Sequence, residues 1–286
     1  MRRTSAVIGL LTILSLVSKV SGVGSLDLTY KNHGLSFGNA PTVHGLRINV
    51  VDRHVKEVNG VNLTFWIPIG KNSNPLFCMN GMAVGLVAPV MHRLYGVGFG
   101  GLGVGADEIT GLAVGGLGVG ADVMTGIGIG GLGIGGDNLT GLLVGGLGVG
   151  ADVMTGVGVG GLGVGGDKLT GLFIGGLGTG GDKLTGFFIS GLANGGDDLT
   201  GLFISGLGAR GDRISGVSMG GLMIRADELR GVHIAPWVHA RRESRGLSVG
   251  LFNYSKRLHG LQIGVINWAG NQHGLLKLLP VVNYHR

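Results

Sequence analysis

The sequence predicts an all-β fold, a β-solenoid (β-helix) of 15-residue coils that is capped at both ends by irregular repeats. Glycine recurs every 15 residues, twelve times without interruption, from Gly81 to Gly246. Apolar residues keep fixed positions between these glycines, and a strict short period is typical of repeats that stack on one another. Hydrophobic residues make up 44% of the 286 residues although 64 are glycine, which excludes a disordered glycine-rich linker.

The positions within each repeat, counted from its glycine, predict how a coil winds. Positions 2, 4 and 7 are apolar in every copy, position 9 is mostly Val or Ile, and position 14 is apolar from Leu94 through Leu229. Short segments alternate as a strand does, but the phase shifts at the glycine pair in positions 5 and 6. Because a chain that bends there keeps the apolar positions together, we expect positions 2, 4, 7, 9 and 14 to face the interior. Another corner is expected at the Asp-x-Leu-Thr segment.

The sequence divides into four segments. Residues 1–22 contain the charged start Arg2–Arg3, a short apolar stretch and small residues near a cleavage point, which predicts a secretory signal peptide. Residues 23–80 are an N-terminal cap with irregular repeats, residues 81–245 the regular solenoid, and residues 246–286 a run of 14-residue repeats with a C-terminal cap. We therefore expect an exported protein of the cell surface, outer membrane or periplasm.

Position 3 should point outward in this scheme, yet it holds large apolar side chains in four coils. These residues are Leu143, Phe173, Phe188 and Phe203. They predict an exposed apolar stripe, which commonly marks contact with a partner or a membrane. The alternative is that the N-terminal segment folds back and covers them.

Position 12 is aspartate in nine consecutive copies. In register these carboxylates would stand about 4.8 Å apart, where two unit charges repel by about 0.9 kcal/mol even in water. We expect each of them to accept backbone N–H groups as an Asx-turn at a corner, so that the column is a structural turn ladder. Its members are Asp107, Asp122, Asp137, Asp152, Asp167, Asp182, Asp197, Asp212 and Asp227.

Bound calcium is the alternative explanation of the aspartate column. Residues 163–169 read Gly-Val-Gly-Gly-Asp-Lys-Leu and overlap the core of calcium-binding RTX repeats. The period is 15 rather than nine, however, and Lys168 and Lys183 directly follow two of the aspartates. The sequence therefore favours no cofactor, with calcium as the one that the alternative would require.

Charge is unevenly distributed along the chain. Residues 96–209 hold nine acidic and two basic residues, whereas residues 210–286 hold eleven basic and four acidic ones. Such an arrangement favours self-association or contact of the basic end with an anionic membrane surface, unless these charges are simply solvated. The chain without residues 1–22 has a net charge of only +3, which does not predict a nucleic-acid partner. The expected partner is an unidentified protein or envelope component.

The late repeats carry a recurring motif. They read Gly-Leu-Ser-Val-Gly-Leu-Phe-Asn over 246–253 and Gly-Leu-Gln-Ile-Gly-Val-Ile-Asn over 260–267, and a central unit reads Gly-Gly-Leu-Gly-Val-Gly-Ala-Asp over 115–122. In these units the chain resembles the bacterial surface-repeat-containing proteins, over residues 34–286. The resemblance implies an exported, surface-associated protein and implies no enzyme.

The sequence contains no recognisable catalytic constellation. His233 and His239 are six residues apart, which is neither helical i,i+4 nor zincin spacing, and Cys78 has no paired histidine pattern. The glycine-rich stretches lack the Lys-Ser/Thr of a phosphate-binding loop. A non-enzymatic structural or interaction scaffold is therefore predicted. Two alternatives stay open, namely an outer-membrane β-barrel in which each repeat is one strand plus a turn, and a calcium-stabilised adhesin.

Overall fold

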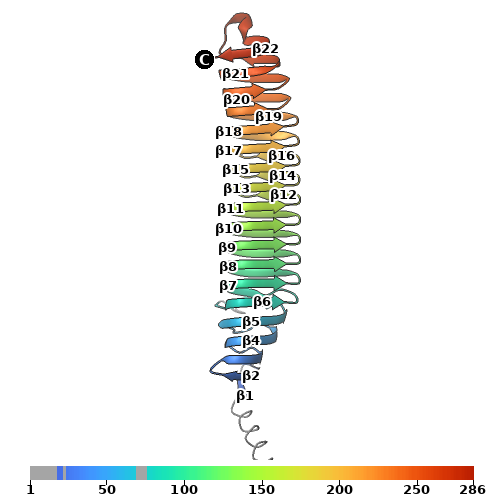
Figure 1. The fold of residues 1–286 in the computed structure, drawn as a ribbon, viewed down its shortest axis with the longest axis vertical. Coiled ribbons are helices and arrows are strands. Elements are labelled where there is room, and N and C mark those ends of the chain that lie inside the picture. The colour runs from blue at the N-terminus through green and yellow to red at the C-terminus, as the bar shows by residue number, and fades with distance from the viewer. Residues whose placement is uncertain (1–17, 22–23, 69–75) are drawn as a thin grey trace, which may run out of the picture. The chain divides into compact units, whose positions relative to one another are not determined.

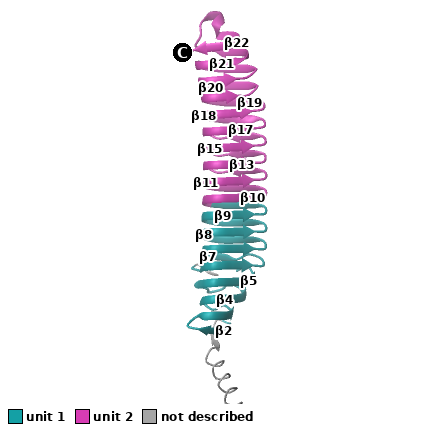
Figure 2. Cartoon of the chain, viewed as in Figure 1, with its two compact units in different colours: residues 1–136 teal, residues 137–286 magenta. Residues whose placement is uncertain are grey.

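The computed structural model describes residues 18–21, 24–68 and 76–286, and it forms two compact units, Met1–Gly136 and Asp137–Arg286 (Figure 2). Each unit is built almost entirely of short β-strands that stack coil upon coil (Figure 1), which confirms the predicted β-solenoid. The proposed signal peptide lies outside the described residues except for Ser18–Ser21, which form strand β1. The unit boundary falls inside the strand Gly133–Gly145 and has no counterpart in the sequence pattern.

Unit 1 begins with antiparallel strands and then winds. Strand β1 pairs antiparallel with β2 and β2 with β3, whereas each pair from β3–β4 to β8–β9 is parallel. The parallel pairs put residues 15 apart side by side, for example Gly96 and Gly111. The strands are β1 (Ser18–Ser21), β2 (Ser25–Tyr30), β3 (His33–Gly38), β4 (Thr42–Val51), β5 (Glu57–Trp66), β6 (Cys78–Gly85), β7 (Val90–Gly100), β8 (Gly103–Gly115) and β9 (Gly118–Gly130), followed by β10 (Gly133–Gly145) at the boundary.

Unit 2 winds in the same way and ends with a strand that folds back. Its neighbouring coils pair in parallel from β11 to β21, and β22 then runs antiparallel along β21, which closes the exposed edge of the last coil. Successive coils therefore run parallel to one another in these strands. The elements are β11 (Gly148–Gly160), β12 (Gly163–Gly165), β13 (Lys168–Gly175), β14 (Gly178–Gly180), β15 (Lys183–Ser190), β16 (Ala193–Gly195), β17 (Asp198–Ser205), β18 (Gly208–Gly220), β19 (Met223–Ile234), β20 (Trp237–Val249), β21 (Phe252–Ala269), the 3-10 helix η1 (Gly274–Lys277) and β22 (Leu278–His285).

The glycine at position 1 is required by the backbone. Gly186 has a φ of 126°, and a Cβ on it would lie 2.1 Å from the carbonyl oxygen of Gly171 in the preceding coil. An L-residue would be strained in this conformation and would also collide with that oxygen. The 15-residue period of glycine is thus the period at which the chain makes this bend against its neighbour.

The bend at the glycine pair is confirmed, but the facing of the side chains differs from the prediction. Positions 9 and 14 are buried as expected, for example Val164 and Leu169. Positions 2, 4 and 7 face outward instead, while position 3 faces the interior, so Leu172 and Ile174 are exposed and Phe173 between them is buried. The predicted inward set was wrong for three of its five positions.

The narrow interior explains this difference. At Gly158, in position 3, a Cβ would lie 2.7 Å from the ring of Phe173 in the next coil. The interior therefore accepts glycine or alanine at many inward positions, where neighbouring large side chains already fill the space. Because glycine does not count as apolar in the sequence pattern, the uniformly apolar positions 2 and 4 looked like the core.

The irregular end coils replace the apolar core by polar networks. In unit 1 the buried Arg47 forms an ion pair with Asp52 and donates to Asn62 Oδ1 at 2.8 Å. In unit 2 Asn253 Nδ2 donates to Asn267 Oδ1 at 2.7 Å, and Asn267 Nδ2 donates to the carbonyl of Gly264. The asparagine of the late repeat motif is thus a core residue that satisfies buried backbone and side-chain acceptors.

Candidate interaction surface

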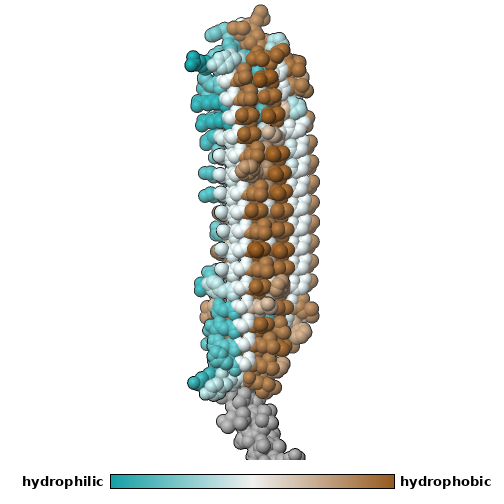
Figure 3. Space-filling view, viewed as in Figure 1, coloured by the Kyte–Doolittle hydropathy of each residue, from teal (hydrophilic) through white to brown (hydrophobic). Residues whose placement is uncertain are grey.

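The outward apolar columns form the main candidate site. We call the side chains at positions 2, 4 and 7 of each coil from Gly96 onward the apolar band. In the coils of Gly231 and Gly246 the bend is one residue shorter, so Pro236 and Leu251 take the place of position 7. The leucines of position 7 from Leu102 to Leu222 are each 45% to 58% exposed. In the space-filling view hydrophobic side chains gather in bands over the strands of each unit, beside a hydrophilic edge (Figure 3). The band comprises Val97, Phe99, Leu102, Leu112, Val114, Leu117, Ile127, Ile129 and Leu132 in unit 1, and Leu142, Val144, Leu147, Val157, Val159, Leu162, Leu172, Ile174, Leu177, Phe187, Ile189, Leu192, Leu202, Ile204, Leu207, Val217, Met219, Leu222, Val232, Ile234, Pro236, Leu247, Val249 and Leu251 in unit 2.

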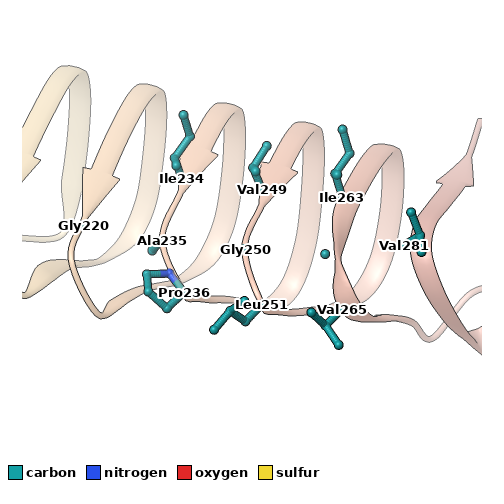
Figure 4. A pocket seen from close by; sticks show the side chains of 11 residues that line it. Gly220, Ile234, Ala235, Pro236, Val249, Gly250, Leu251, Ile263, Val265 and Val281 are labelled. Carbon is teal, nitrogen blue, oxygen red and sulfur yellow. The ribbon is translucent and has the colours of Figure 1, made fainter.

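A groove runs within the band at the C-terminal coils of unit 2. It has a volume of about 580 Å³. One wall is formed by Ile234, Val249 and Ile263, and the opposite wall by Pro236, Leu251 and Val265 (Figure 4). The floor consists of small residues such as Gly250, where a Cβ would lie 2.2 Å from the carbonyl oxygen of Ala235. The groove therefore arises because the bend leaves no room for side chains between two apolar ridges.

The predicted apolar stripe is not on the surface. Leu143, Phe173, Phe188 and Phe203 are buried in the interior of their own coils, and no other segment needs to cover them. The three phenylalanine rings stack in register, with centroids 5.4 Å apart between Phe173 and Phe188 and 5.1 Å apart between Phe188 and Phe203. The stripe prediction was wrong because position 3 faces the core. The residues that do face outward are those at positions 2 and 4, directly before and after position 3 in the sequence.

The nine aspartates lie at a corner of the coil, but the predicted hydrogen bonds are not formed. Eight of them are exposed and Asp227 is half-buried, and none of the nine carboxylates accepts a backbone N–H group. Backbone groups bond along the column instead, as Asp197 N–H does to the Asp182 carbonyl at 3.1 Å. Two carboxylates have side-chain partners: Asp107 lies 2.6 Å from His92 Nδ1, and Asp227 accepts from arginines 241 and 242. The nine aspartates of the column are Asp107, Asp122, Asp137, Asp152, Asp167, Asp182, Asp197, Asp212 and Asp227.

A polar pocket of about 260 Å³ lies in unit 2. Arg210, Arg225 and Arg241 line it together with Asp197 and Asp212. Arg241 pairs with Asp227, whereas Arg210 and Arg225 form no ion pair within the part of the chain that the structure describes. Burial and the neighbouring Arg225 and Arg241 lower the pKa of His239 below its ordinary value.

One serine–histidine contact resembles a catalytic pair but lies inside the solenoid. Ser218 Oγ is 2.6 Å from His233 Nδ1, and both side chains are fully buried. Desolvation lowers the pKa of His233 to about 4, which outweighs the opposite effect of its hydrogen bond with the Arg230 backbone. The pair is therefore closed to a substrate. Sequence reasoning missed this polar inward column, although position 3 changes from phenylalanine to serine and histidine at these coils.

Within the described ranges no three His, Cys, Asp or Glu side chains are grouped so as to hold a metal ion. The described part of the chain contains no helix whose length and hydropathy would suit a membrane span. Comparison with protein-family models found no match, and neither did comparison with curated proteins or with solved structures.

Proposed function

We propose that this protein is an exported, non-enzymatic scaffold of the cell surface or envelope, which uses the apolar band to bind a partner. The observation that carries the proposal is the outward facing of positions 2, 4 and 7 in coil after coil. Monomeric soluble proteins rarely expose apolar patches of more than a few hundred Å², and larger ones usually mark interaction sites. The resemblance of the repeats to bacterial surface-repeat proteins and the signal-like residues 1–22 support export.

The fold also favours a scaffold over an enzyme. Each coil contacts only its neighbours, so a solenoid offers an extended repetitive surface rather than a closed cavity. The buried serine–histidine pair has no access to substrate. The surface, in contrast, repeats the same side-chain types with each coil, which suits a partner that is itself extended.

The test is fractionation of cells that produce the full chain or variants of it. Leu162→Glu with Leu192→Glu places two charges in the band in alternate coils of unit 2. Thr155→Glu with Thr185→Glu places the same charges on the outward threonine column, outside the band. We expect the unaltered chain and the threonine variant to be exported and to sediment with the envelope, whereas the leucine variant moves to the soluble exported fraction.

Two results would contradict the proposed function. In the first, the unaltered chain stays inside the cell. In the second, both double variants sediment with the envelope as the unaltered chain does. Circular dichroism of each purified variant serves as the check that the solenoid is intact.

A further inference from the structure

We propose that the C-terminal coils of unit 2 dock on the surface of an anionic lipid bilayer. The apolar band would lie at the hydrocarbon boundary, and arginines on both of its sides would meet the headgroups. The inference rests on the proposed function, because it uses the same band and names what the band binds in these coils.

The apolar surface is widest in the C-terminal coils. An additional outward column contains Met223, Trp237 and Phe252 in register, and the rings of Trp237 and Phe252 are exposed with centroids 6.2 Å apart. The central coils have glycine at this position, as at Gly163 and Gly178. Trp and Phe beside aliphatic residues are the side chains favoured where a protein enters the interfacial region of a bilayer.

One side of the band carries unpaired cations. Arg210 and Arg225 are in register and are followed in the same column by His239. Neither arginine has an ion-pair partner among the residues that the structure describes, and the Nε of Arg225 is buried without a hydrogen-bond partner. The central coils have glycine in this column, as at Gly165 and Gly180, so the cations are confined to the C-terminal coils of unit 2.

The opposite side of the band also carries cations. Arg230, Arg245 and His259 lie in register and are exposed, in the column that holds threonine in the central coils. Arg230 and Arg245 each pair with a glutamate two residues earlier, at 3.1 Å and 2.7 Å. An apolar strip with arginine columns on both sides is therefore a property of these coils alone within unit 2.

The net charge of the C-terminal coils favours an anionic lipid surface, rather than a second copy of the chain, as the occupant of the band. Residues 210–286 hold eleven basic and four acidic residues, a net charge of +7. A second copy that placed its own C-terminal band on this one would bring arginine columns of like charge together, which costs free energy. An anionic bilayer supplies the complementary charge, and each Lys or Arg near such a surface strengthens binding about fivefold.

The experiment measures binding of the purified full chain to phosphatidylcholine vesicles with and without phosphatidylglycerol, by flotation and by Trp fluorescence. We expect binding to the anionic vesicles alone, with a blue shift of the emission. Arg210→Gln with Arg225→Gln should weaken binding about 25-fold, from two arginines at about fivefold each. Leu251→Glu, on an exposed groove wall, should abolish it.

Matched variants in the central coils provide the controls. Lys168→Gln with Lys183→Gln removes the same charge from the central coils, and Thr155→Glu adds the same negative charge there outside the band. Both should bind anionic vesicles like the unaltered chain. Equal losses in these controls would overturn the proposed site. Absence of binding to anionic vesicles, or equal binding to both kinds, would also overturn it.

A remaining outcome would assign the band to another occupant. If sedimentation shows dimers that Leu251→Glu dissociates, and vesicles are not bound, a second copy occupies the C-terminal band and the lipid proposal is wrong. The proposed function fails separately, through loss of export or of the envelope association tested above. A chain that sediments with envelopes in a band-dependent way but ignores vesicles would refute only the lipid inference.

Discussion

Phe187 and Phe188 show how one position in the chain decides the role of a residue. Phe187, at position 2, is 56% exposed, whereas Phe188, at position 3, is 0% exposed. The two rings are adjacent in sequence and chemically identical, and they differ only in the face of the strand that they occupy. Shifting the assignment of the strand by one residue exchanges its core and surface positions. The apolar pattern of the sequence led to this error at positions 2, 3 and 4.

These two phenylalanines give the first prediction. Phe188→Ala removes a ring stacked between two others, and we expect the free energy of unfolding to fall by about 3–5 kcal/mol. Phe187→Ala removes an exposed ring and should change it by less than about 1 kcal/mol. Urea unfolding of the two variants measures the difference. Equal losses, or a larger loss for Phe187→Ala, would show that position 2 faces the core after all.

The buried His233 gives a pH-dependent prediction. Its pKa is about 4 in the folded chain and 6.5 in the unfolded chain, so the unfolded state takes up the proton first as the pH falls. The stabilising effect of keeping this histidine neutral is fully present above pH 6.5 and is lost progressively toward pH 4. The loss reaches about 3 kcal/mol at the lower limit.

The measurement compares urea unfolding at about pH 7 and about pH 4.5. We expect His233→Gln to lose less stability than the unaltered chain over this interval, because its side chain cannot take up a proton. His273→Gln, at an exposed histidine of the same unit, is the control for loss of a histidine at the surface. The same pH dependence in His233→Gln as in the unaltered chain would contradict the assignment of a buried neutral imidazole.

The coil is the element that the glycine column defines. Gly186 combines a positive φ with a carbonyl oxygen in the place that a Cβ would take. Gly180, in contrast, lies in another column, where a Cβ would meet its nearest atom at 3.7 Å, an ordinary contact distance. Glycine is therefore obligatory at one position of the coil and replaceable at another.

Alanine at each of these glycines tests this distinction. Gly186→Ala should lower the free energy of unfolding by at least about 2 kcal/mol, through backbone strain and the displaced oxygen. Gly180→Ala should leave it unchanged or raise it by about 0.5 kcal/mol, because alanine restricts the unfolded chain. Thermal unfolding followed by circular dichroism gives both values. A tolerated alanine at Gly186 would mean that the bend does not require glycine.

At this scale the sequence predicted the winding but not the side-chain facing. The period, the bend at the glycine pair and the corner at Asp167 could be read because glycine and turn residues report directly on backbone geometry. The facing could not, because the interior is so narrow that Gly158 and Phe173 alternate at an inward position while leucine occupies outward ones. The arginine columns beside the band could not be predicted either, because whether they flank an apolar surface depends on which positions face outward.

At the scale of the whole molecule, the aspartate column raises the question of what offsets its charge. In unit 2 the exposed carboxylates from Asp137 to Asp212 recur in successive coils. At the strand spacing of about 4.8 Å neighbours repel by about 0.9 kcal/mol in water. Lys168 and Lys183 lie beside the column and oppose part of this repulsion. The remainder is a long-range term that dissolved salt should screen.

The last prediction separates screening from specific calcium binding. Raising NaCl from about 0.1 M to about 1 M shortens the screening length from about 10 Å to about 3 Å, so the melting temperature should rise. CaCl₂ at the same ionic strength should give the same rise, and a chelator at fixed ionic strength should change nothing, because one exposed carboxylate per corner is a poor calcium site. Asp167→Asn should raise the melting temperature at low salt and reduce the effect of salt. Stabilisation by calcium well beyond that of NaCl, reversed by the chelator, would instead establish the calcium-stabilised alternative.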